Sequence, residues 1–441
     1  MMNTESIAQI LLDHVAQNNL QADIIIDQGQ SLSLKSSQGE LSEQKVSASR
    51  KIGLRLFDND RVGIAYTEAA DEEALHRLVR QAMDNAQFAR SEPQALTEPL
   101  SKIPESNIDL CPSDTVTTTQ KIQAVLELEA VALAKPDIRR VPYNGISDQL
   151  ARRDIYNSAG LHLSRQSRGV SAFVAPLATR DDDNAMFAGL SVARTFNDLD
   201  LNAIVESSTE EARALLDSQK INSGKYDVIF SPDEQSQLFD VFSMVFSAKA
   251  AKDGTNPWRD KVGQTVAVKS LQLSDNPHLN GMGYALFDDE GTVTQPQPLI
   301  VAGELTTMLH NQATAQYFNT RSTGHAARSP MGNAGISVHQ WHLQGEQGGD
   351  KTLQEGEYLE ITDLQGLHSG ANPIAGTFSF GASGYLCKNG ERLHSVRGIT
   401  VAGNFYDLLQ QIETVGENEK WNSSHSSLMA PVRFGSLSVS A

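Results

Sequence analysis

The sequence predicts an α+β fold with two parts of different character. In the first half, segments with apolar residues at helical spacing flank runs in which apolar and polar residues alternate. From Tyr226 onward the segments become short, alternating and punctuated by glycine, which is typical of a β-rich, barrel-like domain. A stretch over 231–253 is apolar almost all round, as a buried helix is. We therefore expect an N-terminal α+β domain over 1–222 and a β-rich domain over 223–441.

The N-terminal domain begins with a helix–antiparallel sheet–helix unit. Residues 1–20 have the pattern of an amphipathic helix. Residues 71–89 predict a second helix, with acidic residues at its start that suit the helix dipole. Between them, alternation and turn residues predict strands over 22–27, 31–37, 40–49, 51–57 and 61–69.

A proline-rich connector over 91–114 leads into a second set of elements. Its prolines are Pro93, Pro99, Pro104 and Pro112. We expect a helix over 117–134, strands over 139–195 and a helix over 199–216. Helix, strands and helix thus occur twice in the N-terminal half, which predicts a duplicated topology without a visible residue-level repeat.

The C-terminal half combines short strands with a few helices. Its strands are expected over 335–344, 356–367 and 376–403, and its smaller helices over 304–318 and 404–415. The long helix over 231–253 has a thin polar stripe, which consists of Ser236, Asp240, Ser243 and Ser247. Since serines allow close packing, a core helix is the plainest interpretation of this stretch.

Charge, targeting signals and cysteine content narrow the class of protein. Asp and Glu number 54 against 36 Lys and Arg, and the net charge of −18 opposes binding to a phosphate backbone, so we expect no direct nucleic-acid partner. The N-terminus lacks the basic region of a signal peptide, and no stretch approaches the roughly 18 apolar residues of a membrane span. Cys111 and Cys387 form no disulfide framework, and we expect them to be small apolar fillers in a cytoplasmic protein.

Short catalytic signatures are absent from the sequence. It contains no His-Glu-x-x-His, Gly-x-Ser-x-Gly, Walker loop or Cys-x-x-Cys.

His339 and His342 are three apart on a predicted strand, so their side chains would point to opposite faces and not share a metal. The other histidines of the C-terminal half are scattered, and we expect surface or hydrogen-bonded core positions for His310, His325, His368, His394 and His425. Hydroxyls lie near histidines at 322–325 and 423–427, but local sequence does not establish a Ser-His-Asp geometry. Three consecutive acids at 288–290 predict a solvated turn rather than a cation site.

Several phrases, taken in their order along the chain, resemble one protein family. They are GKYDVIFSP (224–232), VGQTVAV (262–268), FDDEGTVTQPQPLIVAGEL (287–305), STGHAAR (322–328) and GLHSGANPIAGTFSFGASGYLCKNGE (366–391). The set is similar to the TldD/PmbA family, long labelled modulators of DNA gyrase, and within it to the PmbA branch, also called TldE. The resemblance covers nearly the whole chain and is most specific in the C-terminal half.

The resemblance implies a degenerate zinc site. The catalytic branch, TldD, is a zinc peptidase whose helix at this location carries His-Glu-x-x-x-His, with a cysteine near the C-terminus as third ligand. Two histidines five residues apart reach one zinc only if the helix is distorted. Here the three positions fall on Phe239, Asp240 and Met244, of which phenylalanine cannot ligate and methionine is a poor zinc ligand. No histidine occurs within 163–277 and no cysteine follows Cys387, so we expect neither catalytic residues nor zinc in this chain.

A role as a partner subunit follows from the same resemblance. TldD and TldE form a heterodimeric protease around an internal chamber, so zinc is expected in a TldD-like partner. This chain would help to enclose unfolded peptides, which pair with strand edges, and it could form a homodimer when alone. Family substrates include small antitoxin proteins and microcin precursors. Two alternatives stay open: an independent hydrolase centred on Asp240 with Ser243 or on a histidine of the β-rich domain, and a gyrase- or DNA-associated regulatory protein.

Overall fold

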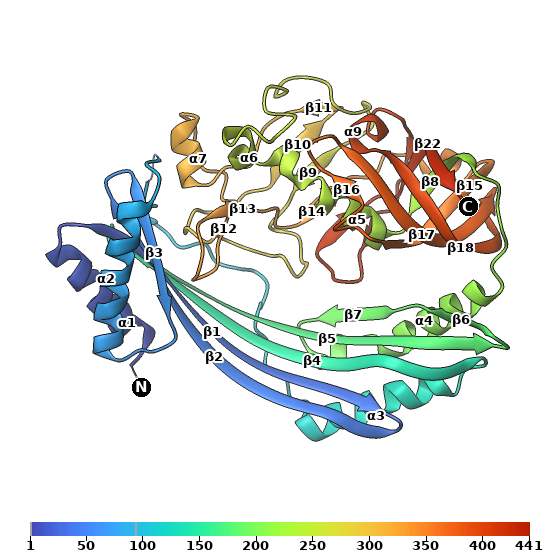
Figure 1. Ribbon diagram of the computed structural model, residues 1–441, viewed down its shortest axis with the longest axis horizontal. Helices are drawn as coiled ribbons and strands as arrows, with labels where there is room; N and C mark the ends of the chain where they lie inside the picture. Colours follow the sequence, from blue (N-terminus) through green and yellow to red (C-terminus); the bar gives the residue numbers. More distant parts are fainter. Residues whose placement is uncertain (1, 93–94) are drawn as a thin grey trace.

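The long strands of the N-terminal half form one curved antiparallel sheet (Figure 1). The computed structural model describes residues 2–92 and 95–441, so Pro93 of the connector lies outside the described residues. The strand order is β3-β2-β1-β4-β5-β6, with β7 paired to β5. The strands are β1 (Gln21–Ser37), β2 (Glu40–Asp58), β3 (Arg61–Thr67), β4 (Ile138–Asn157), β5 (His162–Arg180), β6 (Asp183–Met186) and β7 (Gly189–Ala193).

Strands β1 and β2 are longer than the sequence predicts. The expected breaks between 22–27 and 31–37, and between 40–49 and 51–57, are wrong. Gly29 pairs with Ser49 of β2 on one side and with Ala151 of β4 on the other, so both edges of the backbone are bonded. A polar, glycine-containing stretch therefore remains extended because its neighbours supply partners for its N–H and C=O groups.

Four helices cover one face of this sheet in two pairs (Figure 1). They are α1 (Thr4–Gln17), α2 (Glu72–Phe88), α3 (Thr118–Leu133) and α4 (Leu201–Leu216). Ile24 packs in the cluster under α1 and α2, and Leu34, on the same face of β1, packs under α3 and α4. Ile25 points the other way, towards Phe287 of the C-terminal half. The order helix, strands, helix occurs twice, and both sets contribute to one sheet; duplication itself stays a prediction.

The helix ends follow the capping residues of the sequence. Asp71 accepts a hydrogen bond from the N–H of Ala74 at the start of α2. Thr117 and Gln120 form a capping box at the start of α3. Within the described residues, we find no helix with the length and apolar content that a bilayer crossing requires.

The C-terminal half contains a closed five-stranded barrel, which confirms the predicted α+β class with a barrel-like domain. Its strands are β8 (Gly224–Phe230), β15 (Glu357–Gln365), β17 (Thr377–Lys388), β18 (Glu391–Asn404) and β22 (Val432–Ser440). The order β15-β8-β22-β18-β17 closes because β15 also pairs with β17. Short strands β16 (Ala371–Asn372) and β19 (Ile412–Val415) pair with β17 and β22, respectively.

A second sheet lies beside the barrel in the order β11-β10-β9-β14-β21-β20. Its strands are β9 (Leu273–Asp275), β10 (Gln297–Val301), β11 (Glu304–Leu305), β14 (Trp341–Leu343), β20 (Lys420–Trp421) and β21 (Ser427–Met429). Strands β12 (Ala326–Ala327) and β13 (Gly335–Ile336) form a separate pair. A single apolar cluster joins the barrel to this sheet, so the C-terminal half has one continuous core.

The expected continuous helix over 231–253 is divided into three pieces. They are α5 (Pro232–Val241), the 3₁₀ turn η2 (Ser243–Phe246) and α6 (Ala248–Lys252). Leu309 causes the last break, because its N–H donates to the carbonyl of Phe246 and its carbonyl accepts from Ala248. Ser247 is extended there, and its side chain caps α6 by accepting from Ala250.

Two other expected helices are mostly wrong. Of the stretch 304–318, only α7 (Gln312–Tyr317) is helical, because Asn311 caps it and forms a capping box with Thr314. Of 404–415, only α9 (Phe405–Leu408) is helical, and Ile412–Val415 becomes β19 by pairing with β22. In both cases tertiary hydrogen bonds prevail over helical periodicity.

Candidate functional site

Helix α5 carries the first position at which the resemblance places a zinc ligand. Phe239 is fully buried, and its ring lies 5.3 Å from that of Phe405 and 6.0 Å from that of Trp341, centroid to centroid. Phe242, one turn later, stacks on Phe405 at 4.6 Å. These edge-to-face and stacked contacts belong to the main apolar core. The first position therefore performs packing and offers no donor atom.

Asp240 and Met244 differ from Phe239 in their surroundings. Asp240 is exposed at the end of α5, and one oxygen accepts the indole N–H of Trp341 at 2.7 Å. The residue keeps exposed surface, but its carboxyl group is partly shielded from water where it meets Trp341; this desolvation raises the pKa of Asp240, and the indole hydrogen bond opposes the shift. Met244 lies in η2, beyond the point where α5 ends. The three positions thus provide one carboxylate, whose partner is a tryptophan and not a histidine.

The C-terminal segment, where the resemblance places the third ligand, lies directly against α5. Ser423 donates its N–H and its hydroxyl to Asp233, at 2.9 and 2.7 Å. The Asn422 amide donates to Ser236 at 3.1 Å. Gln235 donates to the carbonyl of Ala430 at 2.9 Å. Hydrogen bonds therefore join the two segments on which the resemblance places the lost zinc-ligand positions.

Asp275, His325 and His339 form a buried cluster that the sequence did not reveal. One oxygen of Asp275 lies 2.5 Å from Nε2 of His325, and both residues are fully buried. Thr323 Oγ1 lies 2.9 Å from Nδ1 of His325, which completes a Thr–His–Asp chain. His339 Nε2 donates to the carbonyl of Gly324 at 2.7 Å. Burial lowers the pKa of His339, since the charged imidazolium is disfavoured away from water.

No sequence spacing pointed to this cluster, because its members come from three segments that meet only in the fold. His325 was expected to take a surface or hydrogen-bonded core position, and it is a buried histidine that contacts Thr323 and the carboxylate of Asp275. His342, three residues after His339, instead pairs with Glu419 at 2.9 Å. Since Asp275 and His325 have no exposed surface, a substrate has no access to this base.

The acidic run at 288–290 is buried, so the expectation of a solvated turn is wrong. Asp288 accepts the N–H groups of Glu290, Thr292 and Ala326, each at 2.9 Å. Burial, followed by the charge of Glu290, raises the pKa of Asp288, and the backbone donors oppose the shift. The loop thus folds around its first carboxylate.

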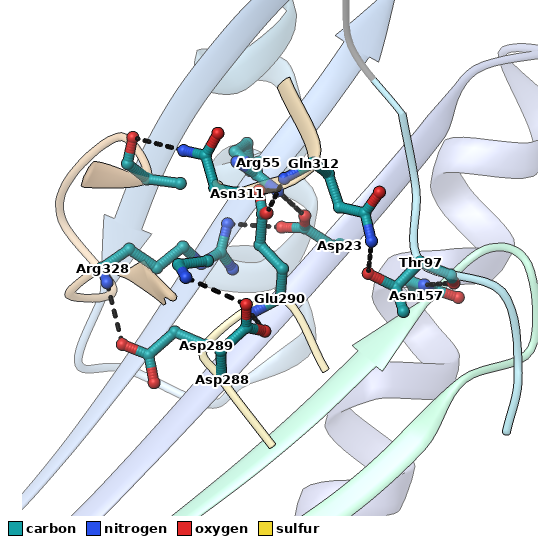
Figure 2. A network of polar contacts seen from close by, with 12 residues as sticks. Asp23, Arg55, Thr97, Asn157, Asp288, Asp289, Glu290, Asn311, Gln312 and Arg328 are labelled. Carbon is teal, nitrogen blue, oxygen red and sulfur yellow. Dashed lines mark hydrogen bonds and ion pairs between the residues drawn. The ribbon is translucent and has the colours of Figure 1, made fainter. Parts of the chain in front are cut away.

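Glu290 pairs with Arg55 of the N-terminal sheet (Figure 2), and Asp289 pairs with Arg153 and Arg165 of the same sheet. Arg55 of β2 lies between Asp23 at 2.5 Å and Glu290 at 2.7 Å, and Arg328 reaches Asp23 at 2.5 Å. Burial alone would raise the pKa of Asp23, but Arg328 and Arg55 hold it below its ordinary value. The network ties the two halves of the chain together.

Two cavities flank the sheet. One, of about 300 Å³, opens between the edge of β5 and the C-terminal loops, and its lining includes Arg165, Gln166, Ser167, Arg194, Asp289 and His339. The other, of about 960 Å³, lies on the helix-bearing face between the two helix pairs, over Gln28, Gln30, Ala48, Arg50, Leu150 and Arg152. Both are large enough for a short segment of polypeptide.

Three domain models of one family match the chain in order. Residues 22–86 match PmbA/TldA metallopeptidase domain 1, residues 111–216 match the central domain, and residues 223–441 match the PmbA/TldA metallopeptidase C-terminal domain. Together they cover most of the sequence, including α5 and the buried cluster.

Curated relatives and solved structures agree with this match. Metalloprotease PmbA of Escherichia coli O157:H7 is 24% identical over 410 residues, which cover 91% of this chain and 89% of that protein. A Metalloprotease PmbA homolog of Haemophilus influenzae is also 24% identical, over 414 residues, 91% of this chain and 89% of that protein. A Thermotoga maritima protein, named as a proposed modulator of a DNA gyrase, superposes with a TM-score of 0.89 at 26% identity over 99% of this chain and 100% of that one. TldE of Thermococcus kodakarensis has the same fold, with a TM-score of 0.86 at 20% identity over 99% and 100% of the two chains. The chain therefore belongs to the PmbA/TldD metallopeptidase family, in its PmbA/TldE branch.

Proposed function

We propose that this chain is a non-catalytic subunit of a TldD–TldE type metalloprotease. The observation that carries the proposal is Phe239: a fully buried aromatic ring stands at the position that the resemblance assigns to the first zinc ligand of the catalytic branch. Asp240 remains as a carboxylate, yet it accepts a hydrogen bond from Trp341 and has no histidine beside it. The family's zinc therefore does not fit this donor set, and it belongs to a TldD-like partner.

The chain's own contribution is architectural. Asp233, Ser236 and Gln235 of α5 hold the C-terminal segment by hydrogen bonds, so the local geometry persists without metal. The resulting surface helps to enclose unfolded peptides, including small proteins of the antitoxin or microcin-precursor type. The cavity beside β5 offers strand-edge backbone to such a peptide. In this proposal the complex acts in the cytoplasm, where the two free cysteines stay reduced.

A second candidate function is hydrolysis at the Thr323–His325–Asp275 chain. The distances resemble those of a catalytic triad. Against it stand the full burial of His325 and the second contact of the Thr323 hydroxyl, which accepts the N–H of His310 at 2.7 Å. A gyrase- or DNA-associated role is disfavoured by the net charge of −18.

Cleavage assays on the full chain separate these functions. We expect no cleavage of an unfolded fluorescent casein by the chain alone, and cleavage on addition of a TldD-type subunit that a chelator abolishes. D240N should leave the activity of the complex within about twofold, because the catalytic base lies in the partner. Chelator-resistant cleavage by the chain alone, lost in T323V, would establish the hydrolase instead.

A further inference from the structure

Three donor atoms converge in the C-terminal half on residues to which the proposed function gives no role. Asp275 ends β9, His325 precedes β12, and His339 lies between β13 and β14. One ligand atom from each lies within 4.8 Å of the other two. We propose that Asp275, His325 and His339 bind one divalent transition-metal ion, at a site built from residues other than Phe239, Asp240 and Met244.

The carboxylate is oriented by the backbone. Asp275 Oδ1 accepts the N–H of His339 at 3.1 Å and that of Gln340 at 2.7 Å. Its other oxygen, Oδ2, faces His325 Nε2 at 2.5 Å. One oxygen is thus anchored and the other points at the first imidazole, as in a carboxylate ligand held by its surroundings.

Each histidine is held through the nitrogen that faces away from the proposed ion. His325 Nδ1 lies 2.9 Å from Thr323 Oγ1, so its N–H can donate a hydrogen bond to that hydroxyl. The hydroxyl in turn donates a hydrogen bond to the carbonyl of His310 at 3.2 Å. His339 Nε2 donates to the carbonyl of Gly324 at 2.7 Å. Metal-binding histidines commonly donate their second ring N–H to such oxygens, which sets the tautomer. The ligand set is then Asp275 Oδ2, His325 Nε2 and His339 Nδ1.

The charge and space around the cluster suit a cation. Two imidazoles and a carboxylate form a donor set typical of Zn²⁺, Co²⁺, Ni²⁺ or Fe²⁺. His339 also lines the cavity of about 300 Å³ beside β5, where water could complete the coordination shell. Such an ion would cross-link the three segments. Its role would be structural, and it would not require the site to cleave a substrate.

The test uses the full chain, stripped of metal with a chelator and then titrated with Co²⁺. We expect one equivalent to bind with visible d–d absorption, which Zn²⁺ then displaces. H339A should weaken binding at least about tenfold, because a ligand is lost. The matched control is H342A, which removes the histidine three residues on that pairs with Glu419 and should bind as the wild type does.

Two further variants keep the test decisive if H339A unfolds. D275N retains one oxygen that can accept both backbone N–H groups but removes the charge, and T323V removes the hydroxyl that contacts His325 Nδ1. Both should weaken binding by about tenfold or more, and both should abolish the rise in Tm that Co²⁺ causes in the wild type. Absence of stoichiometric Co²⁺ and Zn²⁺ binding by the wild type, or equal binding by the wild type, H339A and D275N, would overturn the site. Both results are independent of casein cleavage, so the proposed function can fail or hold separately.

Discussion

At position 239, a buried phenyl ring stands where the family resemblance predicts a lost zinc-ligand position. Phe239 contacts Phe405 and Trp341 at the junction of α5, the barrel and the second sheet. Large buried rings contribute to stability in proportion to the apolar surface that they bury and the cavity that their removal leaves. The residue thus has a structural role that can be measured without any reference to catalysis.

The first prediction concerns this ring. F239A should lower the free energy of unfolding by about 3–5 kcal/mol, since truncation leaves a cavity that the rigid neighbours fill only in part. F88A, at a residue that is 87% exposed, should change it by less than about 0.5 kcal/mol. Urea denaturation followed by circular dichroism measures both, and equal effects of the two variants would contradict the packing role.

Glu234 carries the second prediction, on pH dependence. The side chain is buried near the start of α5, and burial raises its pKa to about 8. Between the ordinary Glu pKa of 4.5 and about 8, the folded chain keeps a proton that the unfolded chain releases, so this residue lowers stability as pH rises. The slope can approach 1.4 kcal/mol per pH unit, roughly the free energy of one pKa unit.

E234Q removes this titration while it keeps the shape of the side chain. The variant should therefore gain stability relative to the wild type between pH 5 and about 8, the folded-state pKa. Denaturation in a series of matched buffers gives the two profiles. Parallel profiles across this range would contradict the proposed titration of Glu234.

Among the secondary-structure elements, barrel closure depends on one glycine. Gly384 of β17 lies so near β15 that an added Cβ would be 1.9 Å from the carbonyl oxygen of Glu360. The pairing of β15 with β17 is what turns the sheet into a closed ring. A side chain at this position would push the two strands apart.

The third prediction follows from this close approach. G384A should destabilise the chain by about 3 kcal/mol, the upper end of the cost of overpacking, because backbone and not a side chain must move. G381A, three residues earlier on β17, meets its nearest atom at 3.5 Å and should cost less than about 1 kcal/mol. A difference below about 0.5 kcal/mol between the two variants in urea denaturation would contradict the steric account.

Element boundaries show where sequence patterns were insufficient. The 231–253 stretch has helical periodicity throughout, yet Leu309 bonds to Phe246 and Ala248 and interrupts it. Conversely, the sequence predicts a break between strands 22–27 and 31–37, yet the polar stretch around Gly29 continues as a strand because β2 and β4 pair with it on both sides. Periodicity shows which face of an element is buried. It does not show which residues far away in the sequence will form hydrogen bonds with the backbone N–H and C=O groups of that element.

Across the whole molecule, a buried charge network joins the N-terminal sheet to the C-terminal half (Figure 2). Arg55 bridges Asp23 and Glu290, whose side chains have almost no exposed surface. Breaking one member of such a network leaves the others charged and without compensation, which is far more costly than loss of an exposed pair.

The fourth prediction tests that connection. R55M should cost about 3–5 kcal/mol, because buried Glu290 loses its arginine partner and buried Asp23 loses one of its two. R77M removes an exposed pair with Glu73 at 3.0 Å and should cost less than about 1 kcal/mol. All three tryptophans lie in the C-terminal half, so fluorescence and circular dichroism should give separate transitions in R55M if the network couples the halves. Coincident, unshifted transitions would contradict this.

The α+β class, the barrel and the family could all be predicted from the sequence, because alternation, helical spacing and ordered local phrases are properties of neighbouring residues. The loss of zinc ligands at Phe239 and Met244 was also predicted there, and it stays a prediction that metal analysis must test. The meeting of Asp275 with His325 and His339, and of Arg55 with Glu290 across 235 residues, arises only in the folded chain. These contacts depend on how strands pair and loops pack over long separations, and single-sequence patterns do not encode such distances.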